Sequence, residues 1–568
     1  MSSMSELLRE PLITLLTRRG IVDEAEQKRF LNPDYERDTH HPSLLKDIDR
    51  AVARIFAAMK AGERIAIYGD FDCDGVPGSA VLHDTFKKVG YENVEVYIPH
   101  RDREGYGVHA SALDTLASRG VSLVITVDVG TTAIEPVAYA KKRGVDVIVT
   151  DHHEVKDVLP DAVAVINPKL GDYPFPDLCG AAVAWKLASA LLIEGKKQGL
   201  ENFVAIPDGW EKWLLDLVCI ATIADLVPLV GENRALAHFG FTVLRKSPRP
   251  GIRAFCAALR LRQHELTEDD ISFSFAPRLN AASRMGNPET AFNLLVAQDR
   301  DEAEKLAAQL EELNAKRKGV VAAIVREAKK RMAARFTPED SVVVMGDAAW
   351  KPALLGLVAN KLLDGRSGIV CLWGQNANGE LKGSCRSDGS IGVVDLFSQA
   401  KDAVEEYGGH HASGGFSISK KQAHTLPEKL AEAAEQVNRV EKEGVSEYDA
   451  LVSLSEMSWP FYREVVKLSP FGMGNPKPVF RVKRTSVVSV RSFGKEKNHV
   501  EVMLSCVESN ASLRAFDFFR TETDFTTRPE SGLGADVLAT LERDTFRGPA
   551  RLVLRLVDIL PTSEGRVL

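Results

Sequence analysis

The chain has 568 residues, of which 45% are hydrophobic and 27% charged, and these proportions are typical of folded soluble protein rather than of disordered or fibrous chains. At roughly 150 residues per domain, this length predicts about four domains. The 72 lysines and arginines against 79 acids leave a formal net charge of −7, which argues against a purely electrostatic coat for nucleic acid. Any polyanionic substrate must therefore be held by a local site.

Seven cysteines are scattered along the chain without a Cys-x-x-Cys pair, so neither a disulfide framework nor a zinc ribbon is predicted. No stretch reaches the roughly 18 uninterrupted apolar residues of a membrane span, and the first residues lack a basic region followed by a long apolar core. We therefore expect a soluble, unprocessed protein in the reducing cytoplasm.

From residue 64 to 150, short apolar runs alternate with helix-like stretches. Fully apolar strands separated by helices indicate a parallel sheet that is covered on both faces. Helices are expected over 181–194 and 211–225. The stretch 241–262 has no acid, and we interpret it as a solvated surface rather than a phosphate site; its basic residues are Arg245, Lys246, Arg249, Arg253, Arg260 and Arg262.

The second half of the chain begins with a predicted long helix or helix pair over 299–335, which lacks proline and has a helical apolar period. A second α/β pattern follows, with strands at 341–346 and 367–373 around a helix at 353–363. It ends in a glycine-dense loop at 408–416. After a charged helix at 427–443, the remaining segment alternates like the strands of a small antiparallel barrel.

Three carboxylates stand on alternate residues, Asp70, Asp72 and Asp74, directly after the first strand. Like charges held this close repel one another unless a cation lies between them. An ordinary polar loop is the competing interpretation. We favour a metal site, because these acids lie between an apolar strand and a glycine-containing helix start.

Two further strands end on acids, one on Asp128 and one on the triplet Asp151-His152-His153. In an open parallel sheet such strand ends lie side by side at the ligand crevice. Asp225, an acid in an otherwise apolar run, adds another oxygen donor. These ligands suit Mn²⁺ or Mg²⁺ better than zinc, and a pair of ions about 4 Å apart supports hydrolysis of phosphoesters or phosphoanhydrides.

Four motifs resemble those of the DHH phosphoesterase superfamily: DFDCDG at 70–75, Asp128 after a strand, DHH at 151–153 and TIADLVPL around Asp225. Other stretches are similar to one branch, the bacterial RecJ exonuclease family: FLNPDYERDTHHPSLLKDIDRAVARI at 30–55, EGYG at 104–107, APRLNAASRMG at 276–286, GSCRS at 383–387, GGH at 408–410 and LSPFGMGNPKPVF at 468–480. The three letters DHH alone would be a weak signal, but this ordered set is specific.

The resemblance implies an α/β protein with a parallel-sheet DHH domain, joined by a long helix to a smaller α/β DHHA1 domain and followed by an antiparallel OB-like barrel. The expected division is 1–45, a helical extension; 46–240, the catalytic DHH domain; 241–335, a helical connector; 336–440, the substrate-binding DHHA1 domain; and 441–568, the single-strand-binding barrel.

The activity that the resemblance implies is a 5′→3′ exonuclease on single-stranded DNA, which releases 5′ mononucleotides in repair and recombination with two Mn²⁺ or Mg²⁺ ions. One ion is expected on Asp72 and Asp128, and the other on Asp74, Asp128, His152 and Asp225. Asp128 and His153 are the expected catalytic residues, the histidine contacting the scissile phosphate. Tyr68 stands where many DHH proteins have a ligand histidine, so that Asp70 or water must fill its place.

The same resemblance assigns the residues that hold the substrate. Arg101, Ser384 and Arg386 are expected to bind the 5′ phosphate, while Arg278, Asn280 and Arg284 line the path of the strand and His410 is a further polar contact. In the barrel, a basic set with nearby aromatics is expected to hold nucleotides: Arg481, Lys483, Arg484, Arg491, Lys495 and Lys497 with Phe480 and Phe493.

Two other functions remain open from the sequence. One is a DHH-family enzyme for short substrates, such as a nanoRNase, a cyclic dinucleotide phosphodiesterase or a pyrophosphatase, although these lack the long helix and the barrel. The other is a DNA-binding scaffold without catalysis, which would require degraded metal ligands. The partners that the resemblance implies are single-stranded DNA with a 5′ end, single-strand-binding protein and a RecQ-type helicase.

Overall fold

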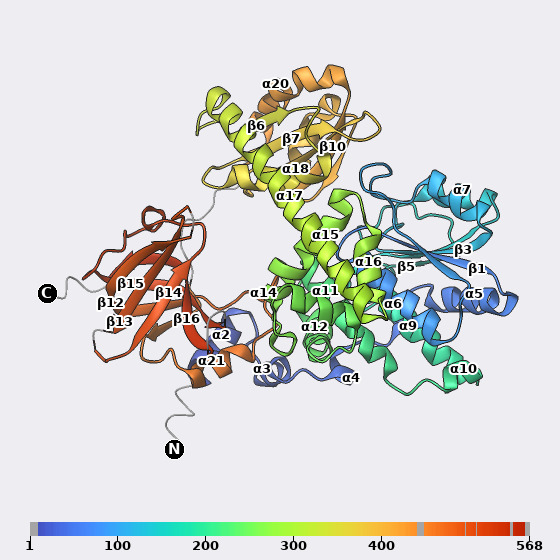
Figure 1. The fold of residues 1–568 in the computed structure, drawn as a ribbon, viewed down its shortest axis with the longest axis horizontal. Coiled ribbons are helices and arrows are strands. Elements are labelled where there is room, and N and C mark those ends of the chain that lie inside the picture. Colours follow the sequence, from blue (N-terminus) through green and yellow to red (C-terminus); the bar gives the residue numbers. More distant parts are fainter. Residues whose placement is uncertain (1–8, 440–447, 495, 507, 546–548, 563–568) are drawn as a thin grey trace. The chain divides into compact units, whose positions relative to one another are not determined.

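The computed structural model describes residues 9–439, 448–494, 496–506, 508–545 and 549–562 (Figure 1). As far as it is described, the chain separates into two compact units. One contains residues 40–227 and 239–443, and the other contains 1–39, 228–238 and 444–568, so the N-terminal helices group with the C-terminal segment. The finer five-part division expected from the sequence stays a prediction, and its boundary at 440/441 lies outside the described residues.

The first sheet has five parallel strands in the order β2-β1-β3-β4-β5. Helices α6 and α9 cover one face and α7 and α8 the other, which explains why the strands are apolar throughout (Figure 1). The strand order reverses between β1 and β3, and a reversal of this kind leaves a crevice at the carboxyl ends of the strands. The predicted parallel sheet is confirmed. The bounds are β1 Arg64–Gly69, β2 Val94–Tyr97, β3 Val121–Val127, β4 Asp146–Thr150, β5 Ala164–Ile166, α6 Gly75–Lys88, α7 Ala110–Ser118, α8 Ile134–Lys142 and α9 Gly180–Lys197.

A helical region follows the sheet and ends in α17, which is one continuous helix of 36 residues. The long helix predicted over 299–335 is therefore confirmed. The helices of this unit are α5 Ile48–Ala61, α10 Glu201–Val204, α11 Leu215–Ala224, α13 Pro250–Ala258, α14 Glu268–Asp270, α15 Ala276–Met285, α16 Glu289–Val296 and α17 Arg300–Arg335, while α12 Gly231–Leu244 runs from one unit into the other.

The basic stretch 241–262 is not entirely the solvated surface that we expected. Arg249 is largely buried, donates a hydrogen bond to Asp216 at 2.9 Å and also pairs with Asp84. This ion network joins α13 to α11 and α6. The two carboxylates satisfy the buried guanidinium, so Arg249 has a structural role between these helices.

The second sheet is mixed and has the order β6-β7-β8-β10-β9. The glycine-dense segment at 408–416 is a β-hairpin rather than the expected loop, because β9 and β10 pair with each other and β10 pairs with β8. The helix expected over 427–443 begins earlier, at Lys420, where a capping box of Ser419 and Gln422 starts it, and it ends at Gln436. The bounds are β6 Val342–Gly346, α18 Pro352–Leu363, β7 Ile369–Gln375, β8 Leu381–Ser387, α19 Val393–Gln399, β9 Glu406–Gly409, β10 Ser413–Ile418 and α20 Lys420–Gln436.

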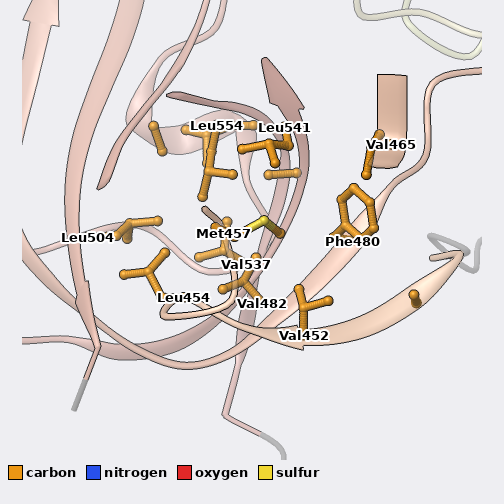
Figure 2. Close-up of a cluster of buried hydrophobic side chains, with 14 of the residues drawn as sticks. Val452, Leu454, Met457, Val465, Phe480, Val482, Leu504, Val537, Leu541 and Leu554 are labelled. Atoms are coloured by element: carbon orange, nitrogen blue, oxygen red, sulfur yellow. The ribbon is translucent and has the colours of Figure 1, made fainter. Parts of the chain in front are cut away.

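The C-terminal strands close into a barrel, because β12 pairs with both β13 and β15. Its core is apolar (Figure 2) and includes Leu15 and Leu16 of the N-terminal helix α2. The predicted barrel is confirmed, but it is not antiparallel throughout, because β14 pairs with β16 in parallel and β11 pairs with β12 in parallel. The elements of this unit are α2 Arg9–Arg18, α3 Glu24–Leu31, α4 Tyr35–Asp38, β11 Ala450–Ser453, α21 Trp459–Val466, β12 Phe480–Phe493, β13 His499–Cys506, β14 Ser512–Asp517, β15 Gly534–Asp544 and β16 Arg551–Pro561.

The barrel surface differs from the one that we expected. Phe480 is 0% exposed and lies in the core, so it is not an aromatic platform for bases (Figure 2). Arg481 pairs with the buried carboxylate of Asp536, and Arg491 pairs with Glu501. Lys495 lies outside the described residues. The alternation of apolar and polar residues along β12 could not predict which side chains face the core, because this strand is long and carries a β-bulge.

Among the described residues, no helix combines the length and the apolar character needed to cross a membrane. All seven cysteines are buried and free.

Candidate metal and phosphate site

The loop between β1 and α6 holds two of the expected ligands in fixed positions. Asp72 Oδ1 accepts hydrogen bonds from the backbone N–H groups of Asp74 at 2.8 Å and Gly75 at 3.1 Å. Asp74 in turn accepts hydrogen bonds from the N–H groups of Gly180 at 2.6 Å and Ala181 at 2.7 Å, in the first turn of α9. Because free N–H groups and the helix dipole favour negative charge, the start of α9 orients this carboxylate.

Asp128 follows β3 with a left-handed backbone, φ 62°. This conformation is unfavourable for residues other than glycine and costs about 1–3 kcal/mol. Gly180 leaves the room that Asp128 needs, because a Cβ at position 180 would lie 2.5 Å from the Cβ of Asp128. Oδ1 of Asp128 is buried and has no hydrogen-bond partner. A strained carboxylate whose buried oxygen makes no hydrogen bond indicates a functional position.

The three residues after β4, Asp151, His152 and His153, have different roles. Asp151 accepts hydrogen bonds from the N–H groups of Thr131 and His152, both at 2.8 Å, and its Oδ1 lies 2.8 Å from Nδ1 of His153. Burial alone would raise the pKa of Asp151, but the contacts with His153 and Thr131 outweigh it and hold that pKa below the ordinary value. Burial alone would lower the pKa of His153, but the hydrogen bond and the charge of Asp151 have the larger effect, so the pKa of His153 is raised. Asp151 therefore positions the two histidines.

His152 faces the acids that come from three other elements. Its Nε2 lies 3.1 Å from Oδ1 of Asp128, 3.6 Å from Oδ2 of Asp74 and 3.7 Å from Oδ2 of Asp225. Asp225 reaches the same place from the C-terminal end of α11. We call the five acids that meet here, with His152, the carboxylate cluster; they are Asp70, Asp72, Asp74, Asp128 and Asp225.

Burial of like charges shifts the pKa values throughout the carboxylate cluster. Burial and the neighbouring Asp72 raise the pKa of Asp74 to about 7, and burial and Asp74 raise the pKa of Asp225 to about 9. Asp128 is shifted upward in the same way, while burial and His153 lower the pKa of His152 to about 4. Close carboxylates with a neutral imidazole form a donor set that fits hard divalent cations.

Asp70 belongs to this arrangement, whereas Tyr68 does not. Ligand atoms of Asp70, Asp72 and Asp128 all lie within 4.8 Å of one another, and Oδ1 of Asp70 is buried without a hydrogen-bond partner. Tyr68 instead packs toward α7 and α8, stacks on Tyr97 at 5.3 Å and donates a hydrogen bond to the carbonyl of Gly107 at 3.0 Å. Its side chain therefore does not take the place of the missing histidine.

Two residues expected at the 5′ phosphate, Arg101 and Arg386, lie beside Arg284, which was expected on the path of the strand. We call these three residues the arginine cluster. Burial lowers the pKa of Arg284 well below its ordinary value, and Arg101 and Arg386 lower it further. Gly356 of α18 makes room for Arg386, because a Cβ there would lie 2.6 Å from its Nη2. Guanidinium groups gathered in this way suit a phosphate, which can bind several of them at once.

Two expected strand contacts and one unexpected residue extend the arginine cluster along α15 and α17. Arg278 pairs with Glu311, and Oδ1 of Asn280 is buried without a hydrogen-bond partner. Arg317, which the sequence analysis missed, donates a hydrogen bond to Asn314 at 2.9 Å, and its Nε is buried without a partner. Arg317 is among the charges that lower the pKa of Arg284. In the sequence, the one signal for Arg317 is that it lies in a run of three basic residues, 316–318.

The remaining expected residues lie on the second sheet. Ser384 and Arg386 are two apart on β8, so they point to the same face of the sheet. His410 is exposed in the turn between β9 and β10. The pKa of Glu154 is lowered chiefly by Lys169 and also by the charge of His410, which places the turn near the DHH motif.

Three family models match the chain: the DHH family N-terminal domain over residues 64–222, the DHHA1 domain over 339–443 and the RecJ OB domain over 448–558. The single-stranded-DNA-specific exonuclease RecJ of Bacillus subtilis is 37% identical over 502 residues, which are 87% of this chain but 61% of that protein. The protein of the same name from Haemophilus influenzae is 30% identical over 576 residues and is matched over 98% of both chains.

Two solved structures extend the comparison. The crystal structure of RecJ in complex with Mn²⁺ from Thermus thermophilus is similar with a TM-score of 0.78 and 26% identity, over 98% of this chain and 76% of that chain. A crystal structure of exonuclease RecJ bound to manganese is similar with a TM-score of 0.59 and 31% identity, over 69% of this chain and 95% of that chain.

Proposed function

This chain belongs to the RecJ family, and from that premise we propose that it is a divalent-metal-dependent exonuclease, which degrades single-stranded DNA from the 5′ end and releases 5′ mononucleotides in DNA repair and recombination. The observation that carries the proposal is the closeness of the two clusters. The guanidinium of Arg101 lies 4.7 Å from the ring centre of Phe71, the residue between Asp70 and Asp72 of the carboxylate cluster. In keeping with this closeness, burial lowers the pKa of Arg101 and of Arg284, while Asp72 opposes the shift in both. A phosphate held by the arginines therefore lies beside the acids.

The carboxylate cluster fits two Mn²⁺ or Mg²⁺ ions, because buried oxygens of Asp70 and Asp128 lack hydrogen-bond partners. We assign Asp72 and Asp128 to one ion, with Asp70 as a further candidate for it, and the second ion to the set Asp74, Asp128, His152 and Asp225. When bound, such ions polarise a phosphate and lower the pKa of a water. Asp128, shared by both sets, keeps the two positions together.

The other residues bind and orient the strand. His153, held by Asp151, contacts the scissile phosphate and stabilises its developing charge. Arg101, Ser384 and Arg386 bind the 5′ phosphate, which sets the distance from the strand end to the cleaved bond. The path of the strand beyond it is lined by Arg278, Asn280, Arg284 and His410.

Digestion of end-labelled single strands tests this proposal. With Mn²⁺, a 5′ label should appear at once as a mononucleotide, while a 3′ label should pass through a ladder of shorter strands, and EDTA should stop both. Release of the 3′ label first, or products longer than one nucleotide, would contradict the proposal. A dinucleotide serves as the control, because preferential cleavage of it would favour the alternative of a nanoRNase or cyclic dinucleotide phosphodiesterase.

We also propose that the barrel holds single-stranded DNA. Phe518 is 43% exposed and Phe519 73% exposed, and the guanidinium of Arg555 lies 4.4 Å above the ring of Phe518. Exposed aromatic rings beside cations suit stacking of bases at about 1–3 kcal/mol each. Removal of residues 441–568 is a poor test, because it would expose Leu15 and Leu16, which pack in the barrel core.

A single substitution on the barrel is a cleaner test. Phe519→Ala should weaken binding of a long strand by about 5- to 100-fold and leave cleavage of a short one unchanged, since the loss is one stacked base. Binding is measured by fluorescence anisotropy. Val488→Ala, at another exposed apolar position of the barrel, is the control. Equal affinity of the Phe519 variant and the parent protein would point to a different function for this surface.

A cytoplasmic location is part of the proposal and is supported by seven buried, free cysteines. Single-strand-binding protein and a RecQ-type helicase are proposed partners on the ground of family membership alone. Co-purification of the full chain with each partner, with and without single-stranded DNA, tests them.

A further inference from the structure

The EGYG segment, residues 104–107, forms a loop that hydrogen bonds hold on both sides of Tyr106, through the Glu104 side chain and the Gly107 carbonyl. On one side, Glu104 accepts hydrogen bonds from the Tyr97 hydroxyl at 2.5 Å and from the N–H of His100 at 2.6 Å. On the other side, the carbonyl of Gly107 accepts the hydrogen bond from Tyr68. The residue in place of the family's ligand histidine therefore holds the loop that carries Tyr106.

Tyr106 is placed directly against the DHH motif. Its hydroxyl lies 3.2 Å from Nδ1 of His153, and the two ring centroids are 5.5 Å apart. Nevertheless, Tyr106 is 51% exposed. Because its ring is half exposed and its hydroxyl contacts the histidine expected at the scissile phosphate, Tyr106 is accessible to a substrate bound there.

The hydrogen bonds around His153 leave the hydroxyl proton of Tyr106 available for donation to another group. Asp151 Oδ1 accepts hydrogen bonds from the backbone N–H groups of His152 and His153 and lies 2.8 Å from Nδ1 of His153. Because an ionised carboxylate can only accept hydrogen bonds, Nδ1 of His153 carries the proton in this contact. Toward this protonated nitrogen the Tyr106 oxygen can only be an acceptor. Within the described parts of the chain, the hydroxyl contacts no other hydrogen-bonding group.

We propose that Tyr106 is a further substrate-contacting residue, whose hydroxyl donates a hydrogen bond to a non-bridging oxygen of the scissile phosphate beside His153. The inference rests on the proposed function. His153 fixes the tyrosine oxygen and leaves its proton directed toward the phosphate. A donor in fixed position acts most strongly where charge develops on the phosphate, so its contribution falls mainly on the rate of cleavage rather than on binding.

The test compares Tyr106→Phe with the unmodified full chain in single-turnover cleavage of a 5′-phosphorylated single strand with Mn²⁺. Loss of one hydrogen bond to a charged group predicts a rate about 10- to 100-fold lower, with the affinity for the strand changed less than about twofold. Tyr139→Phe is the matched control, because its hydroxyl contacts Asp114 on α7, away from both clusters. It should cleave at the parent rate.

Phosphorothioate substitution at the scissile phosphate separates contact with the substrate from an effect through His153. Sulfur in place of the contacted oxygen, in one of the two diastereomers, should slow the parent protein and add little to the loss in Tyr106→Phe. Equal rates of Tyr106→Phe and the parent, or independent losses with both diastereomers, would overturn the inference while cleavage by the parent keeps the proposed function. If the parent does not cleave single strands at all, the proposed function fails and this inference fails with it.

Discussion

The carboxylate cluster and the arginine cluster both bring buried groups of like charge together, negative in the first and positive in the second. Burial and like neighbours raise the pKa of Asp128 in one cluster and lower that of Arg284 in the other. Neither group of charges is neutralised by its own surroundings, which costs stability in the absence of a ligand. The comparison teaches that each cluster suits a ligand of opposite charge, and we propose cations for the first and a phosphate for the second.

The two clusters differ in how the chain builds them. Most of the acids follow strands of one parallel sheet, so a single crevice collects them. The arginines come from three separate places: Arg101 from the loop after β2, Arg284 from α15 and Arg386 from β8. The carboxylate cluster therefore depends on one sheet, whereas the arginine cluster depends on the packing of the second sheet and α15 against the first.

The largest effect is expected in the carboxylate cluster. Asp128→Asn should lower cleavage by at least about 1,000-fold, because one carboxylate is shared by both ion positions. Binding of the strand, measured by anisotropy, should persist, and the metal-free protein should melt at the same or a higher temperature because a buried like charge is removed. Asp161→Asn, at an exposed acid, is the control. Substantial Mn²⁺-dependent cleavage by Asp128→Asn would refute the shared position.

A smaller and more selective effect is expected in the arginine cluster. Arg386→Ala should slow the use of 5′-phosphorylated strands about 10- to 100-fold, since it removes a charge-assisted contact, and should affect 5′-hydroxyl strands much less. Competition between the two substrates in one reaction measures the difference. Lys361→Ala, an exposed cation on α18, is the control. Equal losses on both substrates would mean that Arg386 only attracts the DNA backbone.

The free energy of unfolding of the metal-free protein should depend on pH mainly through the acids of the carboxylate cluster. In the metal-free protein the pKa of Asp74 is about 7 and that of Asp225 about 9, both above the ordinary value of 3.8. The folded state then holds protons that the unfolded state has lost, so stability falls as pH rises, by about 2 kcal/mol per pH unit on average between pH 5.5 and 8.5.

Mg²⁺ should reverse this trend, because it binds the ionised acids and its affinity rises with pH. Thermal melts with EDTA or Mg²⁺ over the same pH range measure both slopes. Asp225→Asn should flatten the metal-free slope, and a slope equal to that of the parent would show that Asp225 does not contribute.

The smallest effect is expected at the edge of the arginine cluster. Arg317→Gln should weaken strand binding by about 3- to 10-fold and lower the slope of log affinity against log salt by roughly one, as for one phosphate contact. Arg326→Gln, at an exposed position of the same helix, is the control and should leave the slope unchanged. If both variants bind alike, Arg317 serves only the packing of α15 on α17.

Local patterns were sufficient to predict the parallel sheet, the barrel and the long helix α17. They also pointed to the strand-end acids that the structure brings together, because an apolar strand and the polar residue after it are neighbours in the sequence. The metal and substrate roles of these residues stay predictions. Arg249 and Phe480 were wrongly placed at the surface, because their burial depends on Asp84, Asp216 and a barrel core that come from remote segments.

By itself, the sequence determined which acidic, basic and imidazole side chains are present and at which ends of strands and helices they lie. Both depend only on residues that are neighbours in the chain. Only the tertiary structure decided that Tyr68 holds the loop of Tyr106 rather than replacing a metal ligand, and that Arg317 belongs with Arg284. It also decided which charges remain unpartnered. Neutralisation of a buried charge depends on distances between atoms that are far apart in the chain, and those distances arise only when the elements pack.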